Sequence, residues 1–233
     1  MFSVIQFPGS NDDLDLRFAM KSVLGGEARL AWHKDASLPA GTQAVLVPGG
    51  FSYGDYLRCG AMARFSPILA DVKRFADAGG PVLGICNGFQ ILCEAGLLPG
   101  ALVRNHHLHF VCDFVNVRVE QSQTPFTTRA NAGDVVRLPI KHGEGAYHAT
   151  PELLSELEAN GQLLLRYVDA QGQPTPEANP NGSVGNVAGV TNERGNVLGL
   201  MPHPEHAVEA GLGGEDGLVL LGSLYDAVTG GSR

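Results

Sequence analysis

The chain has 233 residues, 44% of them hydrophobic and 17% charged, which is room for one large α/β domain or two small ones. Twenty-four acidic and sixteen basic residues give a formal charge of −8, which opposes binding to a nucleic-acid backbone. No run approaches the roughly 20 apolar residues of a membrane span, and no basic leader followed by an apolar stretch opens the chain. We therefore expect a soluble protein that binds neither nucleic acid nor membranes.

The first half of the chain alternates strands with helices. The expected strands are 3–7, 28–32, 44–47 and 81–85, and the expected helices are 13–24, 61–78 and 87–95. The second helix is interrupted or restarted at Pro67. Strand 44–47 is almost wholly apolar, as a buried parallel strand would be, and leads directly into a glycine loop. This alternation predicts a parallel sheet with crossover helices.

The second half of the chain mixes both kinds of pattern. The β-branched runs 114–119 and 135–140 suggest a mixed or antiparallel edge of the sheet. The expected later elements are helix 153–159, strands 163–168 and 196–201, and helix 217–229. The polar stretch 169–186 is expected to be a loop. We predict a single α/β domain over 1–233, with a mostly parallel central sheet, helices on both faces and a small antiparallel edge.

The four cysteines are too few and too scattered for a disulfide scaffold. They are Cys59, Cys86, Cys93 and Cys112, and they include no Cys-x-x-Cys pair. Cys86 and Cys93 are separated by about 10 Å along an expected helix, which exceeds the reach of a disulfide. We therefore expect a reduced, cytoplasmic protein.

The strongest chemical signal is a cysteine at a strand-to-helix turn. A buried strand enters a helix through Gly84-x-Cys86-x-Gly88. Glycines on both sides leave space for a strained turn that lifts the cysteine above the sheet. Helix N-terminal N–H groups there favour the thiolate and stabilise an oxyanion. Cys86 is therefore the candidate nucleophile, and the alternative interpretation is a buried, inert cysteine.

A base and its orienting carboxylate follow another apolar strand. His203 precedes Pro204 and is held in an extended conformation, so Glu205 projects on the same side and can orient the imidazole. We predict a catalytic triad of Cys86, His203 and Glu205, in which the histidine transfers the proton. The glycine loop after strand 44–47 supplies the backbone N–H of Gly50 to an oxyanion hole, together with that of Asn87, although a simple tight turn is the alternative.

Three motifs together resemble those of the class I, triad-type glutamine amidotransferases. They are Pro-Gly-Gly at 48–50, Gly-Ile-Cys-Asn-Gly-Phe-Gln at 84–90 and Met-Pro-His-Pro-Glu at 201–205. Within that class the chain is most similar to the glutaminase subunits of phosphoribosylformylglycinamidine synthases of purine biosynthesis, through segments 49–58, 142–145 and 191–199. The resemblance covers most of the chain and implies a flavodoxin-like sheet.

The resemblance implies a glutamine-hydrolysing subunit that supplies ammonia to a ligase. Cys86 attacks the side-chain amide of glutamine, His203 protonates the departing ammonia, and the glutamyl thioester is hydrolysed to glutamate. The ammonia passes to a large ATP-dependent synthetase subunit, with a small accessory subunit in the same complex. This chain has no Gly-x-x-x-x-Gly-Lys-[Ser/Thr] motif, so ATP and Mg²⁺ are expected on the partner and no cofactor on this chain.

The same resemblance assigns four residues to the glutamine pocket, namely Gly49, Gln90, His142 and Gly143. The chain departs from the family pattern at His206, where arginine commonly follows the Pro-Glu pair. It also departs at Lys141, which replaces a small residue before the His-Gly-Glu-Gly motif. Both departures are expected to alter local charge or docking to the synthetase.

Several other interpretations remain open. His106, His107 and His109 are dense enough for zinc, but a set without further ligands favours a polar loop, so we assign no metal. The acidic residues Asp12, Asp13 and Asp15 favour a helix start. A cysteine peptidase or a deglycase-like hydrolase would use the same turn on another carbonyl, and a non-catalytic regulatory subunit would not use it at all.

Overall fold

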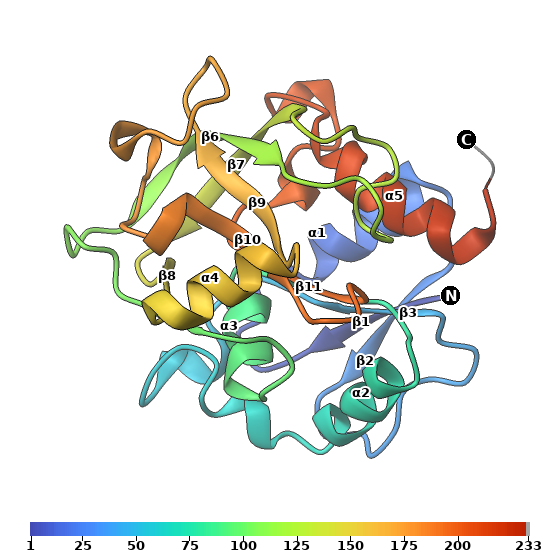
Figure 1. Cartoon of the computed structure of the whole chain (residues 1–233). Coiled ribbons are helices and arrows are strands. Elements are labelled where there is room, and N and C mark those ends of the chain that lie inside the picture. The colour runs from blue at the N-terminus through green and yellow to red at the C-terminus, as the bar shows by residue number, and fades with distance from the viewer. Residues whose placement is uncertain (232–233) are drawn as a thin grey trace.

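A nine-stranded mixed sheet forms the centre of the part of the chain that the computed structural model describes, residues 1–231 (Figure 1). Its strand order is β2-β1-β3-β4-β11-β10-β9-β6-β7. The bounds are β1 Phe2–Gln6, β2 Ala28–Trp32, β3 Ala44–Val47, β4 Val82–Ile85, β6 Val111–Val119, β7 Val135–His142, β9 Leu163–Val168, β10 Val187–Thr191 and β11 Val197–Leu200. A separate antiparallel pair joins β5 (Ala101–Val103) to β8 (Ala146–His148).

The sheet has a parallel half and an antiparallel half. Strands β2, β1, β3, β4 and β11 are parallel neighbours, and β10, β9, β6 and β7 continue the sheet in antiparallel pairs. The central strands β3, β4 and β11 are four residues each and buried throughout, as expected for strands covered on both faces. The predicted α/β class, with a largely parallel sheet and an antiparallel edge, is confirmed.

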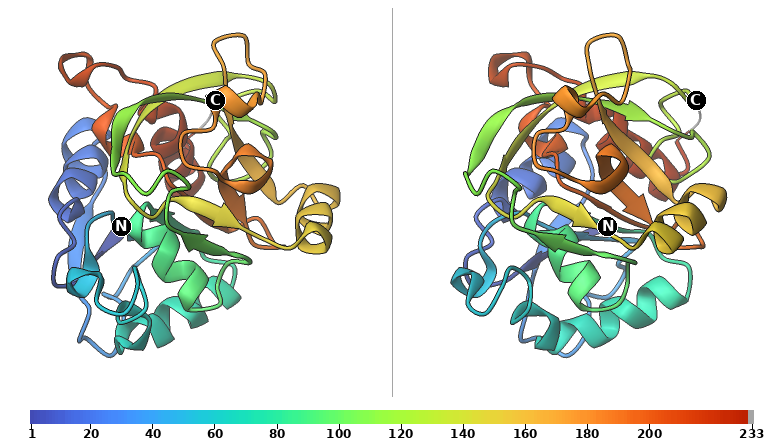
Figure 2. Two further views of the ribbon diagram at one scale, coloured as in Figure 1. Left: turned by 90° about the vertical axis from the view of Figure 1, so that its left-hand side faces the viewer. Right: turned by 60° about the vertical axis from the view of Figure 1, so that its left-hand side comes forward.

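Helices cover both faces of the sheet, as predicted. The helices are α1 (Asp13–Phe18), α2 (Ile68–Asp77), α3 (Asn87–Glu94), α4 (Pro151–Ala159) and α5 (Gly217–Thr229). Helices α1 and α5 lie on one side of the parallel strands, and α2 and α3 lie on the other (Figure 1, Figure 2). Within residues 1–231, no helix is both long enough and apolar enough to cross a bilayer.

Most predicted elements are present, with local differences. The predicted helix 13–24 is α1 followed by a π-helical turn at Ala19–Val23, and helix 61–78 is a short 3₁₀ turn followed by α2, which starts after Pro67. Strand β10 has no counterpart among the predicted strands. Its Gly189 lies so close to β11 that an added Cβ would stand 3.0 Å from the carbonyl oxygen of Gly199.

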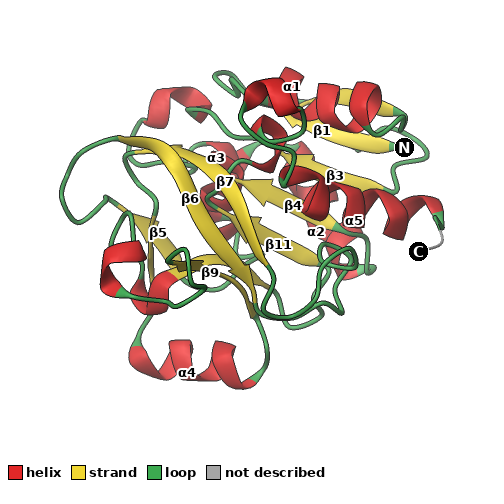
Figure 3. Cartoon of the chain, turned by 90° about the horizontal axis from the view of Figure 1, so that it is seen from above, coloured by secondary structure: helices red, strands yellow, loops and turns green. Residues whose placement is uncertain are grey.

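The antiparallel half brings β7 to the parallel half's carboxyl edge. Figure 3 shows the long, curved β6 and β7 crossing the line of the parallel strands. The segment after β11 lies against β7, since the backbone N–H of His203 donates to the carbonyl of Pro139 at 2.8 Å. Side chains from β7 therefore reach the edge where β3, β4 and β11 end.

Candidate active site

Cys86 stands at a strained turn between β4 and α3. Its φ is 51° and its ψ is −105°, in the positive-φ region that non-glycine residues rarely adopt. The flanking glycines permit this turn, because a Cβ on Gly88 would lie 2.0 Å from the carbonyl oxygen of Val47, and one on Gly84 would lie 2.5 Å from the side chain of Leu92. The local sequence therefore produces the expected elbow.

His203 and Glu205 form a buried pair after β11. The imidazole of His203 is fully buried, and its Nδ1 lies 2.6 Å from Oε1 of Glu205. A carboxylate on Nδ1 fixes the ring and leaves Nε2 for proton transfer. Nε2 is buried and has no hydrogen-bond partner among the described residues.

The charges around His203 favour its protonated form. Burial by itself lowers the pKa of His203, but the charge of Glu205 and the interaction with Cys86 outweigh burial and raise the pKa to about 10. The imidazole is therefore positively charged at neutral pH. A cation beside the thiol of Cys86 stabilises a thiolate, which is the reactive form of the side chain.

A cavity of about 210 Å³ opens beside the sulfur of Cys86. Its lining comes from the loop after β3, the elbow, and the end of β7 with the following turn: Gly50, Phe51, Asp55, Cys59, Cys86, Gln90, Phe110, Lys141, His142, Gly143 and Glu144. The volume lies below the range of about 300–1,000 Å³ that holds drug-sized ligands. It therefore suits a single small molecule.

Four of the predicted site residues line this cavity beside Cys86, namely Gly50, Gln90, His142 and Gly143. Gly49 does not line it. A Cβ on Gly49 would lie 2.4 Å from Oδ2 of Asp12 and 2.7 Å from Cε1 of His203, so Gly49 provides space behind the imidazole. A contact between Gly49 and substrate stays a prediction.

Asn87 and Gln90 are held in place by hydrogen bonds. The amide of Asn87 donates to Oε1 of Gln90 at 2.8 Å and accepts from the backbone N–H of Ser52 at 3.1 Å. Gln90 in turn donates to the carbonyl of Glu144 at 2.6 Å. These bonds connect α3 to the two loops that frame the cavity, so the three segments are mutually fixed.

The two predicted oxyanion donors come from different segments. Asn87 is the first residue of α3, so its backbone N–H has no acceptor within the helix. Gly50 has φ 136°, and a Cβ there would lie 2.4 Å from the carbonyl oxygen of Gly9. Gly50 lines the cavity beside Cys86, and Asn87 directly follows Cys86 in the chain. That the two N–H groups bind one oxyanion stays a prediction.

His142 contributes backbone to the cavity, because its side chain is buried elsewhere. Its Nδ1 lies 3.2 Å from Oδ1 of Asn105, and its Nε2 lies 3.5 Å from Nδ2 of Asn181. Burial, followed by the charge of His203, lowers the pKa of His142 to about 4. The side chain is therefore neutral and structural at physiological pH.

An acidic wall of the cavity was not among the predicted site residues. It consists of Asp55 and Glu144, with Cys59 beside them. Burial raises the pKa of Asp55 and the charge of Glu144 adds to the effect, although a hydrogen bond from Cys59 opposes it. Oδ1 of Asp55 is buried without a partner in residues 1–231. The sequence signal was present, because both carboxylates lie within the segments that carry the family resemblance.

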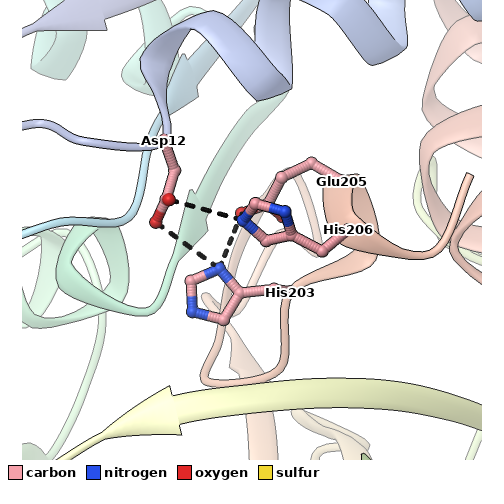
Figure 4. A group of neighbouring side chains, drawn as sticks. All are labelled: Asp12, His203, Glu205 and His206. Carbon is pink, nitrogen blue, oxygen red and sulfur yellow. Dashed lines mark hydrogen bonds and ion pairs between the residues drawn. The ribbon is translucent and has the colours of Figure 1, made fainter. Parts of the chain in front are cut away.

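A second carboxylate, from Asp12, approaches His203 (Figure 4). Its Oδ2 lies 3.7 Å from Nδ1 of His203, and its Oδ1 contacts Nζ of Lys141 at 2.5 Å and Nε2 of His206 at 3.3 Å. Asp12 and His206, with His203 and Glu205, place four possible metal-ligand atoms within 4.8 Å of one another. Because the ammonium of Lys141 is already paired with Asp12, we interpret the group as a charge network.

The histidines at 106, 107 and 109 form a separate loop. Both ring nitrogens of His107 are used: Nε2 lies 3.1 Å from the carbonyl of Pro180, and Nδ1 accepts from the backbone N–H of His109 at 3.1 Å. The rings of His107 and His109 stack with centroids 5.8 Å apart. These contacts fit the polar-loop interpretation.

The elbow, the buried histidine–carboxylate pair and the α/β sheet are the arrangement expected of an enzyme that transfers acyl groups through a cysteine. Residues 2–212 match the family model of the CobB/CobQ-like glutamine amidotransferase domain, and the chain belongs to this family. The predicted membership of the class I glutamine amidotransferases is thereby confirmed.

The chain is similar along nearly its whole length to two proteins that bear the name phosphoribosylformylglycinamidine synthase subunit PurQ. The protein from Thermomicrobium roseum is 58% identical over 96% of this chain and 94% of its own length. The one from Salinibacter ruber is 58% identical over 98% and 97%. Among solved structures, a chain of the PurLQS structure from Thermotoga maritima superposes with a TM-score of 0.85 and 41% identity, covering 97% of both chains.

Proposed function

We propose that this chain is the glutaminase subunit of a phosphoribosylformylglycinamidine synthase. The observation that carries the proposal is the strained Cys86, which faces an amino-acid-sized cavity next to the His203–Glu205 pair. Full-length similarity to the PurQ subunits supports the same activity. The reaction converts glutamine and water to glutamate and ammonia.

The sulfur of Cys86 attacks the side-chain carbonyl carbon of glutamine, and the carbonyl oxygen becomes an oxyanion. The backbone N–H groups of Gly50 and Asn87 stabilise this charge. Protonated His203 transfers its Nε2 proton to the nitrogen, the C–N bond breaks and ammonia leaves a glutamyl thioester. Water then attacks the thioester while His203 accepts its proton, and glutamate is released as the thiolate re-forms. Glu205 stabilises the imidazolium and holds the ring in orientation throughout.

The acidic wall determines how glutamine is oriented. Its α-ammonium group faces Asp55 and Glu144, because these carboxylates line the cavity and Asp55 has an unpaired oxygen among the described residues. Arg104 neutralises Glu144 only weakly, since their atoms are 3.4 Å apart and the arginine side chain is 76% exposed. The amide end of the substrate then points toward Cys86, with Gln90 and the backbone of His142 and Gly143 beside it.

Ammonia is consumed by a partner. The large synthetase subunit binds ATP and Mg²⁺ and forms the amidine, and a small accessory subunit completes the complex. The similarity to a synthase subunit and to a chain of a PurLQS assembly supports this arrangement. The cavity volume favours a free amino acid over a peptide substrate, and the assembled histidine–carboxylate pair disfavours a purely regulatory subunit.

The whole chain forms one amidotransferase domain of the cytoplasm. The family model ends at residue 212, but α5 packs against the 3₁₀ turn Pro204–His206 that carries Glu205. The C-terminal helix therefore supports the site, which favours 1–233 as a single unit.

Cys86→Ala in the reconstituted complex tests the proposal. We expect glutamine-dependent amidine formation to fall by about 1,000-fold or more, while formation from added ammonium salts stays within about twofold of wild type. Cys112→Ala is the matched control, because that cysteine is exposed and outside the cavity. Retained glutamine-dependent turnover in Cys86→Ala would overturn the assignment.

A further inference from the structure

Asp12 occupies a position that a helix start does not explain. It precedes α1 and is 2% exposed, yet its side chain makes no capping hydrogen bond to that helix. The carboxylate instead points toward the imidazole of His203 (Figure 4). Gly49 leaves the space between them open, since a Cβ there would lie 2.4 Å from Oδ2 of Asp12 and 2.7 Å from Cε1 of His203. The neighbouring Asp13 pairs with Nε2 of Gln6 at 2.6 Å. Of these two neighbouring carboxylates, only that of Asp12 approaches His203, whereas that of Asp13 pairs with Gln6.

Asp12 is a permanent negative charge beside the catalytic base. Burial raises its pKa, but the hydrogen bond from His206, the charge of His203 and the contact with Lys141 together hold the pKa well below the usual range for aspartate. Oδ2, the oxygen nearest His203, has no hydrogen-bond partner in the described residues, so its charge is directed at Nδ1 rather than at a neighbouring donor.

The two departures from the family pattern meet at this carboxylate. Lys141 comes from β7 and His206 from the turn after His203, and both contact Oδ1 of Asp12. Lys141 also connects to the nucleophile, because its carbonyl accepts from the Cys86 thiol at 3.8 Å. Their common partner explains both departures as local charge, since the Lys141 ammonium and the His206 ring both contact the carboxylate through Oδ1, while Oδ2 is the oxygen that approaches His203.

The ionisable groups facing His203 come from four segments. They are Asp12 before α1, Cys86 before α3, His142 on β7, and Glu205 and His206 in its own turn, and Lys141 on β7 acts through its contact with Asp12. Glu205 and Asp12 both approach Nδ1, at 2.6 Å and 3.7 Å. Glu205 makes the hydrogen bond, and Asp12 acts at longer range.

We infer that Asp12 is a positioning residue for the glutaminase reaction, which works with Glu205 to keep His203 protonated and oriented, while Lys141 sets how much of its charge reaches the imidazole. Asp12 does not touch the substrate. Its effect appears in the pH range over which His203 can donate a proton to the departing amide nitrogen of glutamine. This inference rests on the proposed glutaminase activity.

Removing the negative charge of Asp12 and removing the positive charge of Lys141 should shift the pH profile in opposite directions. Asp12→Asn keeps the shape and removes the negative charge, so the basic limb of the pH profile of kcat/KM for glutamine moves lower by about one unit. Lys141→Met removes the compensating positive charge, so the limb moves higher. The double variant, with neither charge, shows a smaller shift than Asp12→Asn alone. Titration of the His203 ring by NMR of ¹³C-labelled histidine gives the same order without any turnover.

Asp13→Asn is the matched control and leaves the limb within about 0.2 units of wild type, a tolerance of roughly 0.3 kcal/mol. Circular dichroism of each variant and its co-purification with the synthetase subunit show that the variants fold and assemble. Shifts of Asp12→Asn and Lys141→Met in the same direction, or activity losses that are uniform in pH, would refute the positioning role. If Asp12→Asn does not fold, the sign of the Lys141→Met shift decides alone. Loss of glutamine hydrolysis in Cys86→Ala is a separate result, so failure of this inference leaves the proposed function intact.

Discussion

Cys86 and Cys59 line the same cavity, but their surroundings have opposite electrostatic character. Cys86 is the more buried of the two and adjoins the imidazolium of His203. Cys59 is partly exposed and adjoins Asp55 and Glu144, and burial together with these carboxylates raises its pKa far above that of an ordinary thiol. Exposure alone would make Cys59 the reactive cysteine. If Cys86 is the nucleophile, as proposed, the sign of the neighbouring charge matters more than access to solvent in selecting it.

The largest expected effect comes from removing the carboxylate of Glu205, which stabilises the positive charge of His203 beside Cys86. Glu205→Gln cannot stabilise the imidazolium of His203 and permits the wrong tautomer, so kcat for glutamine should fall by about 1,000-fold. Steady-state glutaminase assays of the complex measure this loss. Glu209→Gln changes an exposed acid four residues later and should have no effect. A Glu205→Gln enzyme within about tenfold of wild type would mean that the pair is not catalytic.

Alkylation compares the two thiols directly. At pH 7, iodoacetamide should modify Cys86 at least about 100-fold faster than Cys59, because thiolate is the reacting species and carboxylates suppress it at Cys59. Mass spectrometry of digested peptides gives both rates in one sample. The exposed Cys112 serves as an internal standard for a free thiol. Equal rates at the two cavity cysteines would remove the electrostatic explanation.

Asp55→Asn should reduce the difference in alkylation rate between Cys86 and Cys59. Loss of a carboxylate lowers the pKa of Cys59, so its alkylation becomes faster, and the α-ammonium of glutamine loses a partner. We expect KM for glutamine to rise about tenfold with little change in kcat. Asp15→Asn, at an exposed position on α1, is the control. A fall in kcat without a change in KM would show that Asp55 does not bind the α-ammonium.

The smallest expected effect concerns the stability of the fold and not the reactivity of either thiol. His142 is buried as the neutral ring with a pKa of about 4, whereas the unfolded chain binds a proton near 6.5. Its contribution is therefore fully present above about pH 6.5 and is lost as the pH falls toward 4. The free energy of unfolding should drop by about 1 kcal/mol between pH 7 and 5.5, beyond any drop in His142→Asn. Urea titrations of both proteins measure this difference, and identical pH dependence would contradict it.

Local sequence determined the elements whose residues are neighbours in the chain. The ranges 28–32, 44–47, 163–168 and 217–229 match observed strands and a helix at both ends, because each is a short apolar pattern bounded by turn residues. The elbow follows from Gly84 and Gly88, since only residues without a side chain fit there. The proximity of His203 and Glu205 was also predictable, because only Pro204 separates them. The expected extended backbone was wrong, since Pro204–His206 forms a 3₁₀ turn.

Only the tertiary structure decided which distant side chains meet. Strand β10 forms between β9 and β11 although its own sequence is short and contains Gly189, because its neighbours supply hydrogen bonds and packing. The contact of Asp12 with Lys141 joins residues 129 positions apart, and Asp55 and Glu144 meet across a cavity that neither segment forms alone. Patterns of two to four residues determine local conformation. The pairing of distant charges depends on the curvature of the sheet, because that curvature places β7 beside the carboxyl ends of the parallel strands.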